Sequence, residues 1–291
     1  MPLVAAAILP HGFPLIPLLS DDADGAMRTR RAMEAVGRRF TDQGVEAIVL
    51  AGPHGIRVDG AICLANVARG AGTLHWRGRQ VEMNVPCDRA LIEAIADACR
   101  RDGIPLALAG FGGNRPEQSV APLDWGAIVP LWFIGHGQHR PGLGHVLAEA
   151  VPDGEDGPPV VLVTPSRSLP RDTMLAFGAT LARVAQASGR RIAFVASCDW
   201  AHTHAASGPY GYHPKAAEVD ARVMEAVREG DLAQLLRLPE DDVQQAAIDG
   251  LWQLLMLAGV QQEVPLGGDL LSYEVSGYYG MIVAAYARSD A

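Results

Sequence analysis

The sequence predicts an α/β fold, a three-layer α/β/α sandwich around a mostly parallel or mixed sheet. Short apolar runs, each bounded by Gly, Pro or polar residues, have the length and composition of buried strands. Between several of them lie longer segments whose apolar residues recur at helical spacing. Such alternation is typical of helices that cover both faces of a sheet.

The predicted strands are short and aliphatic, and cover residues 3–9, 46–51, 105–109, 127–134, 159–164 and 191–197. A hairpin is expected over TLHWRGRQVEMNV, residues 73–85, with its turn near Arg77 and Gly78. The predicted helices cover residues 24–42, 88–101, 171–188, 214–228 and 240–259. No internal repeat or shift of composition divides the chain, so we expect one domain over residues 1–291.

Charge and composition exclude several classes of protein. The formal net charge is −9, and Lys and Arg cluster only in short runs such as Arg30-Arg31, so neither nucleic acid nor an anionic membrane surface is an expected partner. Four cysteines without a CxxC pair indicate free thiols in a reducing compartment. No charged n-region of a secretory signal and no apolar stretch of roughly 18 residues is present. We therefore expect a cytoplasmic protein.

Histidines follow three of the predicted strands. His11 lies in Pro10-His11-Gly12 after residues 3–9, and His54 lies in Pro53-His54-Gly55 after residues 46–51. The segment CDWAHTH after residues 191–197 adds His202 and His204. A single loop histidine is usually a surface residue, but ligands of α/β folds bind beyond the carboxyl ends of strands. The repeated Pro-His-Gly therefore indicates two imidazoles that converge on a divalent metal.

A carboxylate would complete the facial triad that is typical of non-haem Fe(II) sites. Spacing alone leaves Asp22, Asp199 and Glu274 open as the third ligand. Glu274 has one local argument, because it lies in LLSYEVSGYYGMIVAAY, where a carboxylate is costly unless a cation or metal pairs with it. A capping role or a partly exposed edge position explains Glu274 equally well.

Four segments occur in the order of a known family. ILPHG, AGPHG, VASCDWAHTHAASGPYGYHP and LSYEVSGYYGMIVAAY resemble motifs of the class III extradiol ring-cleavage dioxygenases, of the protocatechuate 4,5-dioxygenase and aminophenol dioxygenase type. The matched segments run from about residue 5 to residue 286, so the resemblance covers nearly the whole chain. It implies an α/β/α sandwich, which agrees with the alternation of strands and helices.

The resemblance also implies the chemistry. His11, His54 and Glu274 would bind Fe(II), and His202 would be the catalytic histidine. Both atoms of O2, the co-substrate, would be inserted into a catechol- or aminophenol-type ring by meta cleavage. Asp199, His204 and Tyr210 are expected near the substrate, as is Trp125, which stands where the family commonly has a histidine. Tryptophan has an N–H donor and no acceptor, so it can stack on a ring but cannot transfer a proton.

Two other functions fit the same residues. The Memo branch shares the scaffold without requiring a catechol substrate, and Trp125 keeps that reading open. Two histidines and a carboxylate also suit a zinc-dependent hydrolase. A homo-oligomer is expected because closed two-fold assemblies are common, and some relatives of this type work with a small partner subunit.

Overall fold

Consecutive residues of the apolar runs alternate between two hydrophobic cores, one on each face of a mixed sheet. The computed structural model describes residues 3–21, 26–110, 116–139, 141–142, 144 and 157–288. Within them, eight strands pair in the order β10-β11-β1-β9-β2-β8-β3-β6. Their bounds are β1 Leu3–Leu9, β2 Ala47–Ala51, β3 Ile62–Ala65, β6 Leu106–Ala109, β8 Val160–Thr164, β9 Ile192–Ser197, β10 Leu266–Ser276 and β11 Tyr279–Arg288.

The four central strands β1, β9, β2 and β8 are parallel, so their carboxyl ends meet at one edge. The hairpin β10–β11 adds to β1 in the antiparallel sense, and β3 is antiparallel to β8. In β2, Ala47, Val49 and Ala51 face one core, whereas Ile48 and Leu50 face the other. The predicted mixed sheet is confirmed.

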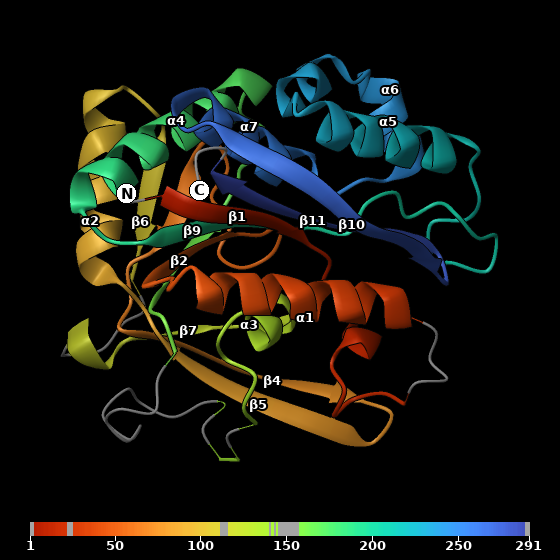
Figure 1. Ribbon diagram of the computed structural model, residues 1–291, viewed down its shortest axis with the longest axis horizontal. Coiled ribbons are helices and arrows are strands. Elements are labelled where there is room, and N and C mark those ends of the chain that lie inside the picture. Colours follow the sequence, from red (N-terminus) through yellow and green to blue (C-terminus); the bar gives the residue numbers. More distant parts are fainter. Residues whose placement is uncertain are drawn as a thin grey trace.

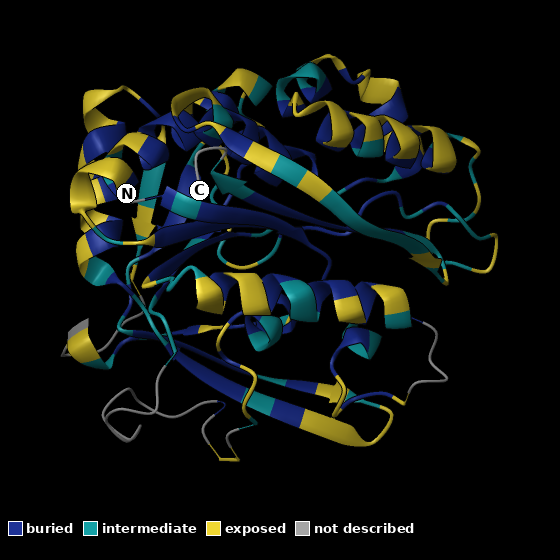
Figure 2. Ribbon diagram, viewed as in Figure 1, coloured by how far each residue is buried: buried dark blue, intermediate teal, exposed yellow. Residues whose placement is uncertain are grey.

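Helices cover one face of the sheet, and helices with a small sheet cover the other (Figure 1). The first face carries α2 Arg89–Arg101, α4 Arg171–Ser188, α5 Lys215–Glu229, α6 Glu240–Ala246 and α7 Leu251–Glu263. The opposite face carries α1 Met27–Asp42, α3 Trp125–Phe133 and a small sheet of β5 Arg79–Pro86, β4 Arg69–Trp76 and β7 Val120–Pro122. Short 3-10 helices are η1 Phe13–Leu15, η3 Pro116–Gln118 and η5 Leu232–Arg237. Figure 2 shows the central strands buried between these layers.

The predicted strand 127–134 is wrong, because these residues belong to helix α3. A short run of apolar residues does not distinguish a strand from a buried helix. Asp124 decides the outcome locally, since its carboxylate accepts a hydrogen bond from the Gly126 N–H and so caps the helix. Gly37 of α1 lets the two helices approach, because a Cβ there would lie 2.0 Å from the Phe133 carbonyl oxygen.

The predicted helix 240–259 is two helices, α6 and α7, separated by residues 247–250. Ala247 ends α6 in the left-handed conformation, with φ 49°. The expected hairpin is confirmed as β4–β5, and Arg77 and Gly78 make its turn with positive φ. The other predicted elements are found with ends shifted by up to three residues.

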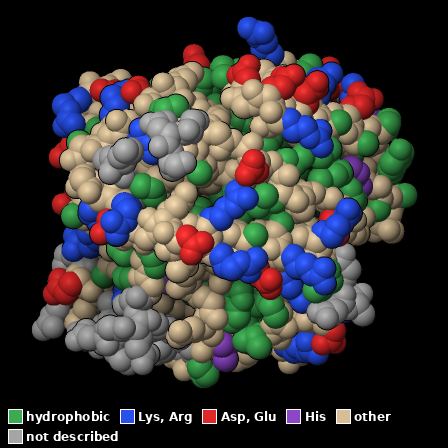
Figure 3. Space-filling view, viewed as in Figure 1, with side chains coloured by type: hydrophobic (Ala, Val, Ile, Leu, Met, Phe, Trp, Pro, Cys, Tyr) green, Lys and Arg blue, Asp and Glu red, His purple; other side chains and the backbone are tan. Residues whose placement is uncertain are grey.

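Acidic and basic side chains are interspersed over the described part of the face shown in Figure 3. No helix in the described ranges combines the length and apolar character that crossing a membrane requires.

Candidate metal centre

His11 leaves strand β1 at the carboxyl edge of the sheet and is almost wholly buried. Its backbone N–H donates to Asp199 Oδ1 at 3.0 Å, and its Nδ1 lies 3.0 Å from Ser197 Oγ at the end of β9. The next residue packs against β11, because a Cβ on Gly12 would lie 2.3 Å from the Tyr279 hydroxyl oxygen and would displace that side chain. The first Pro-His-Gly is therefore fitted to its neighbours on β9 and β11.

A helix proline fixes which ring nitrogen of His11 carries the proton. Pro130 has no N–H to donate to the carbonyl of Gly126, four residues earlier in α3. That carbonyl instead accepts the Ser197 hydroxyl at 2.5 Å. The hydroxyl has a single hydrogen, so Ser197 Oγ must accept from the His11 Nδ1–H. The lone pair of neutral His11 is therefore on Nε2.

His54 follows strand β2, and its ring lies beside that of His11 with centroids 5.2 Å apart. Its Nδ1 is 3.1 Å from Asp124 Oδ2, the carboxylate that also caps α3. This is a close contact without hydrogen-bond geometry. The backbone carbonyl of His54 accepts a hydrogen bond from Thr164 Oγ1. A carboxylate beside one ring nitrogen is common for a metal-binding histidine, and Nε2 is then the ligand atom.

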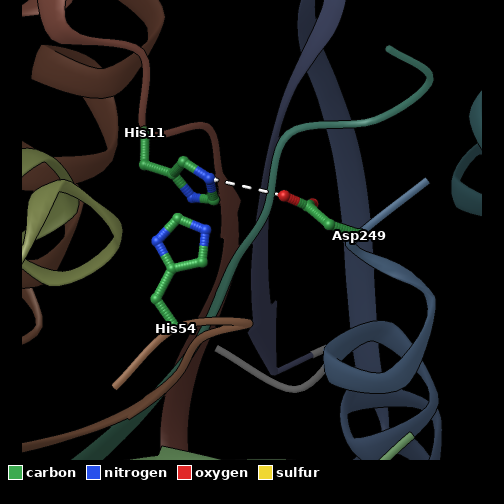
Figure 4. A group of neighbouring side chains, drawn as sticks. All are labelled: His11, His54 and Asp249. Atoms are coloured by element: carbon green, nitrogen blue, oxygen red, sulfur yellow. Dashed lines mark ion pairs between the residues drawn. The ribbon is translucent and has the colours of Figure 1, made fainter. Parts of the chain in front are cut away.

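Asp249 supplies the carboxylate from the break between α6 and α7. Its Oδ2 lies 3.6 Å from His11 Nε2 (Figure 4). Its Oδ1 is buried, with no hydrogen-bond partner among the described residues. Gly250, which follows, packs so closely that a Cβ would lie 2.6 Å from the Cys198 Cβ. This contact holds the Asp249 backbone against the end of β9.

Among the described residues, His11, His54 and Asp249 form a group that could hold a metal ion. Each offers one ligand atom, and these atoms all lie within 4.8 Å of one another. Burial lowers the pKa of His11, but the carboxylates of Asp199 and Asp249 outweigh it and raise that pKa to about 9. The field at His11 Nε2 therefore strongly favours a cation. Two imidazole nitrogens and an orphaned carboxylate oxygen fit a divalent metal with open coordination positions.

The structure corrects the expectation that Glu274 binds the metal together with His11 and His54. Glu274 lies on β10, and it is not part of the group formed by His11 and His54. Its Oε2 accepts from the backbone N–H and hydroxyl of Thr29 at 2.7 and 2.6 Å, and its Oε1 pairs with Arg28. These bonds lower the pKa of Glu274 against the effect of its burial. The carboxylate thus caps the first turn of α1, which has no capping side chain of its own.

His202 lies beside the group formed by His11, His54 and Asp249, and its Nε2 makes no hydrogen bond to a described residue. Its Nδ1 lies 2.9 Å from the carbonyl oxygen of Ala247, which can only accept, so Nδ1 carries the proton. Nε2 then has the lone pair, and it lies 4.0 Å from Asp249 Oδ2. Tyr279 stacks on the ring with centroids 5.9 Å apart. Ala247 is the left-handed residue that ends α6, so one turn positions both Asp249 and His202.

A cavity of about 810 Å³ opens in front of these side chains. His11, His54, His202 and Asp249 line it together with an aromatic wall of Phe13, Trp76, Trp125, Tyr210, Trp252 and Tyr279. The Trp125 ring stands edge-on to His54 with centroids 4.5 Å apart. Tyr210 is largely exposed at the cavity and lies beside His202. The volume is in the range of small-molecule sites.

The other predicted site residues are placed differently. Asp199 lines the cavity, but it is buried against His11. His204 is not in the lining, and its Nε2 lies 2.8 Å from Asp220, a buried carboxylate that also accepts from Tyr273. The expectation that His204 touches the substrate is thus corrected to a structural bond. Asp22 lies outside the described residues.

Asp249, the carboxylate that converges with the two histidines, is not among the candidates that the sequence indicated. Asp249 lies within residues 240–259, which the helical spacing of apolar residues predicts as one helix. The signal that could have found it is Asp249-Gly250, a dipeptide that marks turns. A carboxylate in a predicted break between helices would then have competed with Glu274.

The chain is similar to known proteins over nearly its whole length. Residues 5–284 match the family model described as the catalytic LigB subunit of aromatic ring-opening dioxygenase. The chain is 23% identical over 286 residues to Protein CA_C1420 of Clostridium acetobutylicum. That match covers 97% of this chain and 57% of the relative, so the chain spans little more than half the length of that protein.

A similar fold occurs in the crystal structure of uncharacterized protein JW3007 from Escherichia coli K12. The TM-score is 0.61 with 17% sequence identity, and the match covers 97% of this chain and 99% of that chain. At this identity the likeness concerns the fold.

Proposed function

Because the chain belongs to the family of catalytic LigB subunits of aromatic ring-opening dioxygenases, we propose that it is a non-haem Fe(II)-dependent extradiol dioxygenase. Its substrate would be a catechol- or aminophenol-type ring, cleaved in the meta position with both atoms of O2 incorporated. His11, His54 and Asp249 would hold the iron. The observation that carries the proposal is the convergence of these three ligand atoms at an aromatic-walled cavity that also contains His202.

Iron held by these residues would bind the ring hydroxyl or amine groups and O2, and would lower the pKa of a bound hydroxyl. His202 Nε2 is the base placed to accept the hydroxyl proton, because the Ala247 carbonyl holds the other ring nitrogen protonated. Trp125 and Phe13 offer apolar faces against which an aromatic ring can stack. Trp125 cannot transfer protons, so we assign the acid–base role to His202.

Oxygen uptake tests the proposal. Protein loaded anaerobically with Fe(II) is given a panel of catechols and 2-aminophenols and then exposed to air. Stoichiometric O2 uptake with a yellow ring-fission product supports it. No uptake with any diol or aminophenol contradicts it and favours a Memo-like protein without oxygenase activity. Zinc as the metal retained after purification without added metal would favour the hydrolase.

Variants separate metal binding from turnover. His11→Ala and Asp249→Asn should lose iron, whereas His202→Ala should keep iron and lose turnover by about 10²- to 10⁴-fold. His75→Ala is the matched control, since His75 is exposed on β4 and lies outside the cavity lining. Full iron occupancy in His11→Ala would contradict the ligand assignment.

We also propose that the protein is a homo-oligomer and that it is cytoplasmic. Light scattering of the purified chain tests the oligomeric state. A chain that is monomeric and inactive until a small second protein is added would indicate the two-subunit type instead.

A further inference from the structure

Gln253 is a buried amide in the first turn of helix α7, and it belongs neither to the candidate metal centre nor to the lining of the cavity. It has no exposed surface and is the one polar side chain in the buried stretch 251–260. Its Nε2 donates to the Ser197 carbonyl at 3.2 Å, whereas its Oε1 has no hydrogen-bond partner among the described residues. An unpaired acceptor inside a protein costs free energy, so packing alone does not explain an amide here.

Ser197 is the junction between Gln253 and His11. Its hydroxyl oxygen accepts from the His11 Nδ1–H, and its carbonyl accepts from Gln253. Ser197 is the last residue of β9 and lies one position past the last pair of that strand with β2, Ala51 with Ala196. The end of β9 is therefore bonded through one residue both to a histidine of the candidate metal centre and to helix α7.

Asp249 lies four residues before Gln253, at the point where α7 begins. Its Oδ2 is 3.6 Å from His11 Nε2, so the start of α7 meets the end of β9 through both side chains. The close contact of Gly250 with Cys198 limits how near α7 comes to β9. Such a van der Waals contact leaves sliding along the strand free, whereas a hydrogen bond is directional and fixes the position of the helix.

We propose that Gln253 is a positioning residue of the candidate metal centre, which fixes α7 on β9 so that the Asp249 carboxylate faces His11. The inference rests on the proposed function only for the use of this centre by a metal. The connection runs from His11 through Ser197 to Gln253, and then back along the first turn of α7 to Asp249. Without the amide donor, Asp249 can shift relative to His11, and metal binding weakens.

Gln253→Met tests this role in the metal-free protein. Methionine is apolar and of similar size, so it fills the space, removes the unpaired Oε1 and removes the donor to Ser197. We expect the Zn(II) affinity, measured by competition with a chelating dye, to fall by about fivefold or more, the factor that one hydrogen bond contributes. The visible spectrum of Co(II) bound at the site should change as well, because it depends on the number and arrangement of the ligands.

The urea midpoint of Gln253→Met should change little, because the lost hydrogen bond and the removed unpaired oxygen have opposite effects on stability. Gln261→Met is the matched control. Gln261 lies on the same helix, and its Nε2 donates to the Leu266 carbonyl at 3.3 Å, outside the cavity lining. A residue that only stabilised the fold would not alter the Co(II) spectrum. Wild-type Zn(II) affinity and a wild-type Co(II) spectrum in Gln253→Met would therefore overturn the inference, whatever the midpoint.

A measurement on the wild-type protein decides the matter if Gln253→Met does not fold. Coupling between two sites is reciprocal, so Zn(II) should slow hydrogen exchange of the Gln253 side-chain amide by a similar factor. An exchange rate that Zn(II) leaves unchanged would contradict the positioning role. None of these measurements needs oxygen or turnover. Protein that shows this linkage but takes up no O2 would contradict the proposed dioxygenase activity and leave the role of Gln253 standing.

Discussion

The Ser197 hydroxyl connects helix α3 to His11, and its removal gives a quantitative test of the site. Ser197→Ala leaves the His11 Nδ1–H and the Gly126 carbonyl without this partner. Ser197 has no exposed surface and His11 is 1% exposed, so water cannot replace the hydroxyl without rearrangement. Each buried group left unpaired costs about 1–3 kcal/mol, so the free energy of unfolding should fall by about 2 kcal/mol or more.

Metal affinity should fall as well. Without Ser197 the proton of neutral His11 is free to move to Nε2, which removes the ligand lone pair. Loss of an outer partner of this kind weakens metal binding by about 10- to 100-fold. Urea denaturation of the metal-free protein measures the stability, and competition with a chelating dye for Zn(II) measures the affinity.

Pro130→Ala separates the two effects. It introduces an N–H that competes with Ser197 for the Gly126 carbonyl, while alanine favours the helix. This variant should bind metal more weakly without losing stability. Ser188→Ala is the control, because its hydroxyl bonds to Ala185 at the end of α4. Wild-type metal affinity in both Ser197→Ala and Pro130→Ala would refute the role of this hydrogen-bonded chain.

Three further predictions concern Asp249, Gly250 and Glu274. Asp249→Asn should weaken Zn(II) binding by more than roughly 100-fold, the largest effect expected from loss of a residue that only hydrogen-bonds to a ligand. Glu274→Gln should leave Zn(II) binding unchanged. Dye competition that shows weak binding in Glu274→Gln and normal binding in Asp249→Asn would restore Glu274 as the ligand. Gly250→Ala places a Cβ 2.6 Å from the Cys198 Cβ and should lower both the melting temperature and the metal affinity. A variant that melts at the same temperature as the wild-type protein would show that this contact is not tight. Glu274→Gln should cost about 1 kcal/mol of stability through the lost cap on α1. The pKa of Glu274 in the folded protein lies below the ordinary value of 4.5. The stability that the ionised carboxylate contributes is therefore complete above pH 4.5 and is lost as the pH falls through the pKa of the folded state. The stabilities of the wild-type protein and Glu274→Gln should converge in acid unfolding curves.

Local pattern was enough for the elements whose periodicity is unambiguous. Strands β1, β2 and β9 are found at short apolar runs bounded by Gly, Pro or polar residues, and helix α4 is found where apolar residues recur at helical spacing. The pattern failed at residues 127–134, where an apolar run is compatible with both, and at 247–250, where a break lies within a continuous amphipathic segment. At α3 the capping Asp124 decided the structure, and at the break between α6 and α7 the close contact of Gly250 with Cys198 decided it.

The sequence by itself determined strands β1, β2, β6, β8 and β9, the Pro-His-Gly segments that follow β1 and β2, and the place of His202 after β9, because each depends on residues close together in the chain. Strands β3, β10 and β11 are not among the apolar runs that were predicted as strands, and the order of the strands depends on contacts between distant segments. Only the tertiary structure decided which carboxylate joins the histidines. Glu274 and Asp249 are both carboxylates in apolar segments, and the choice depends on packing between distant segments. Glu274 is placed against the first turn of α1, which binds its oxygens, whereas the α6–α7 break packs Asp249 against the end of β9 with one oxygen unpartnered.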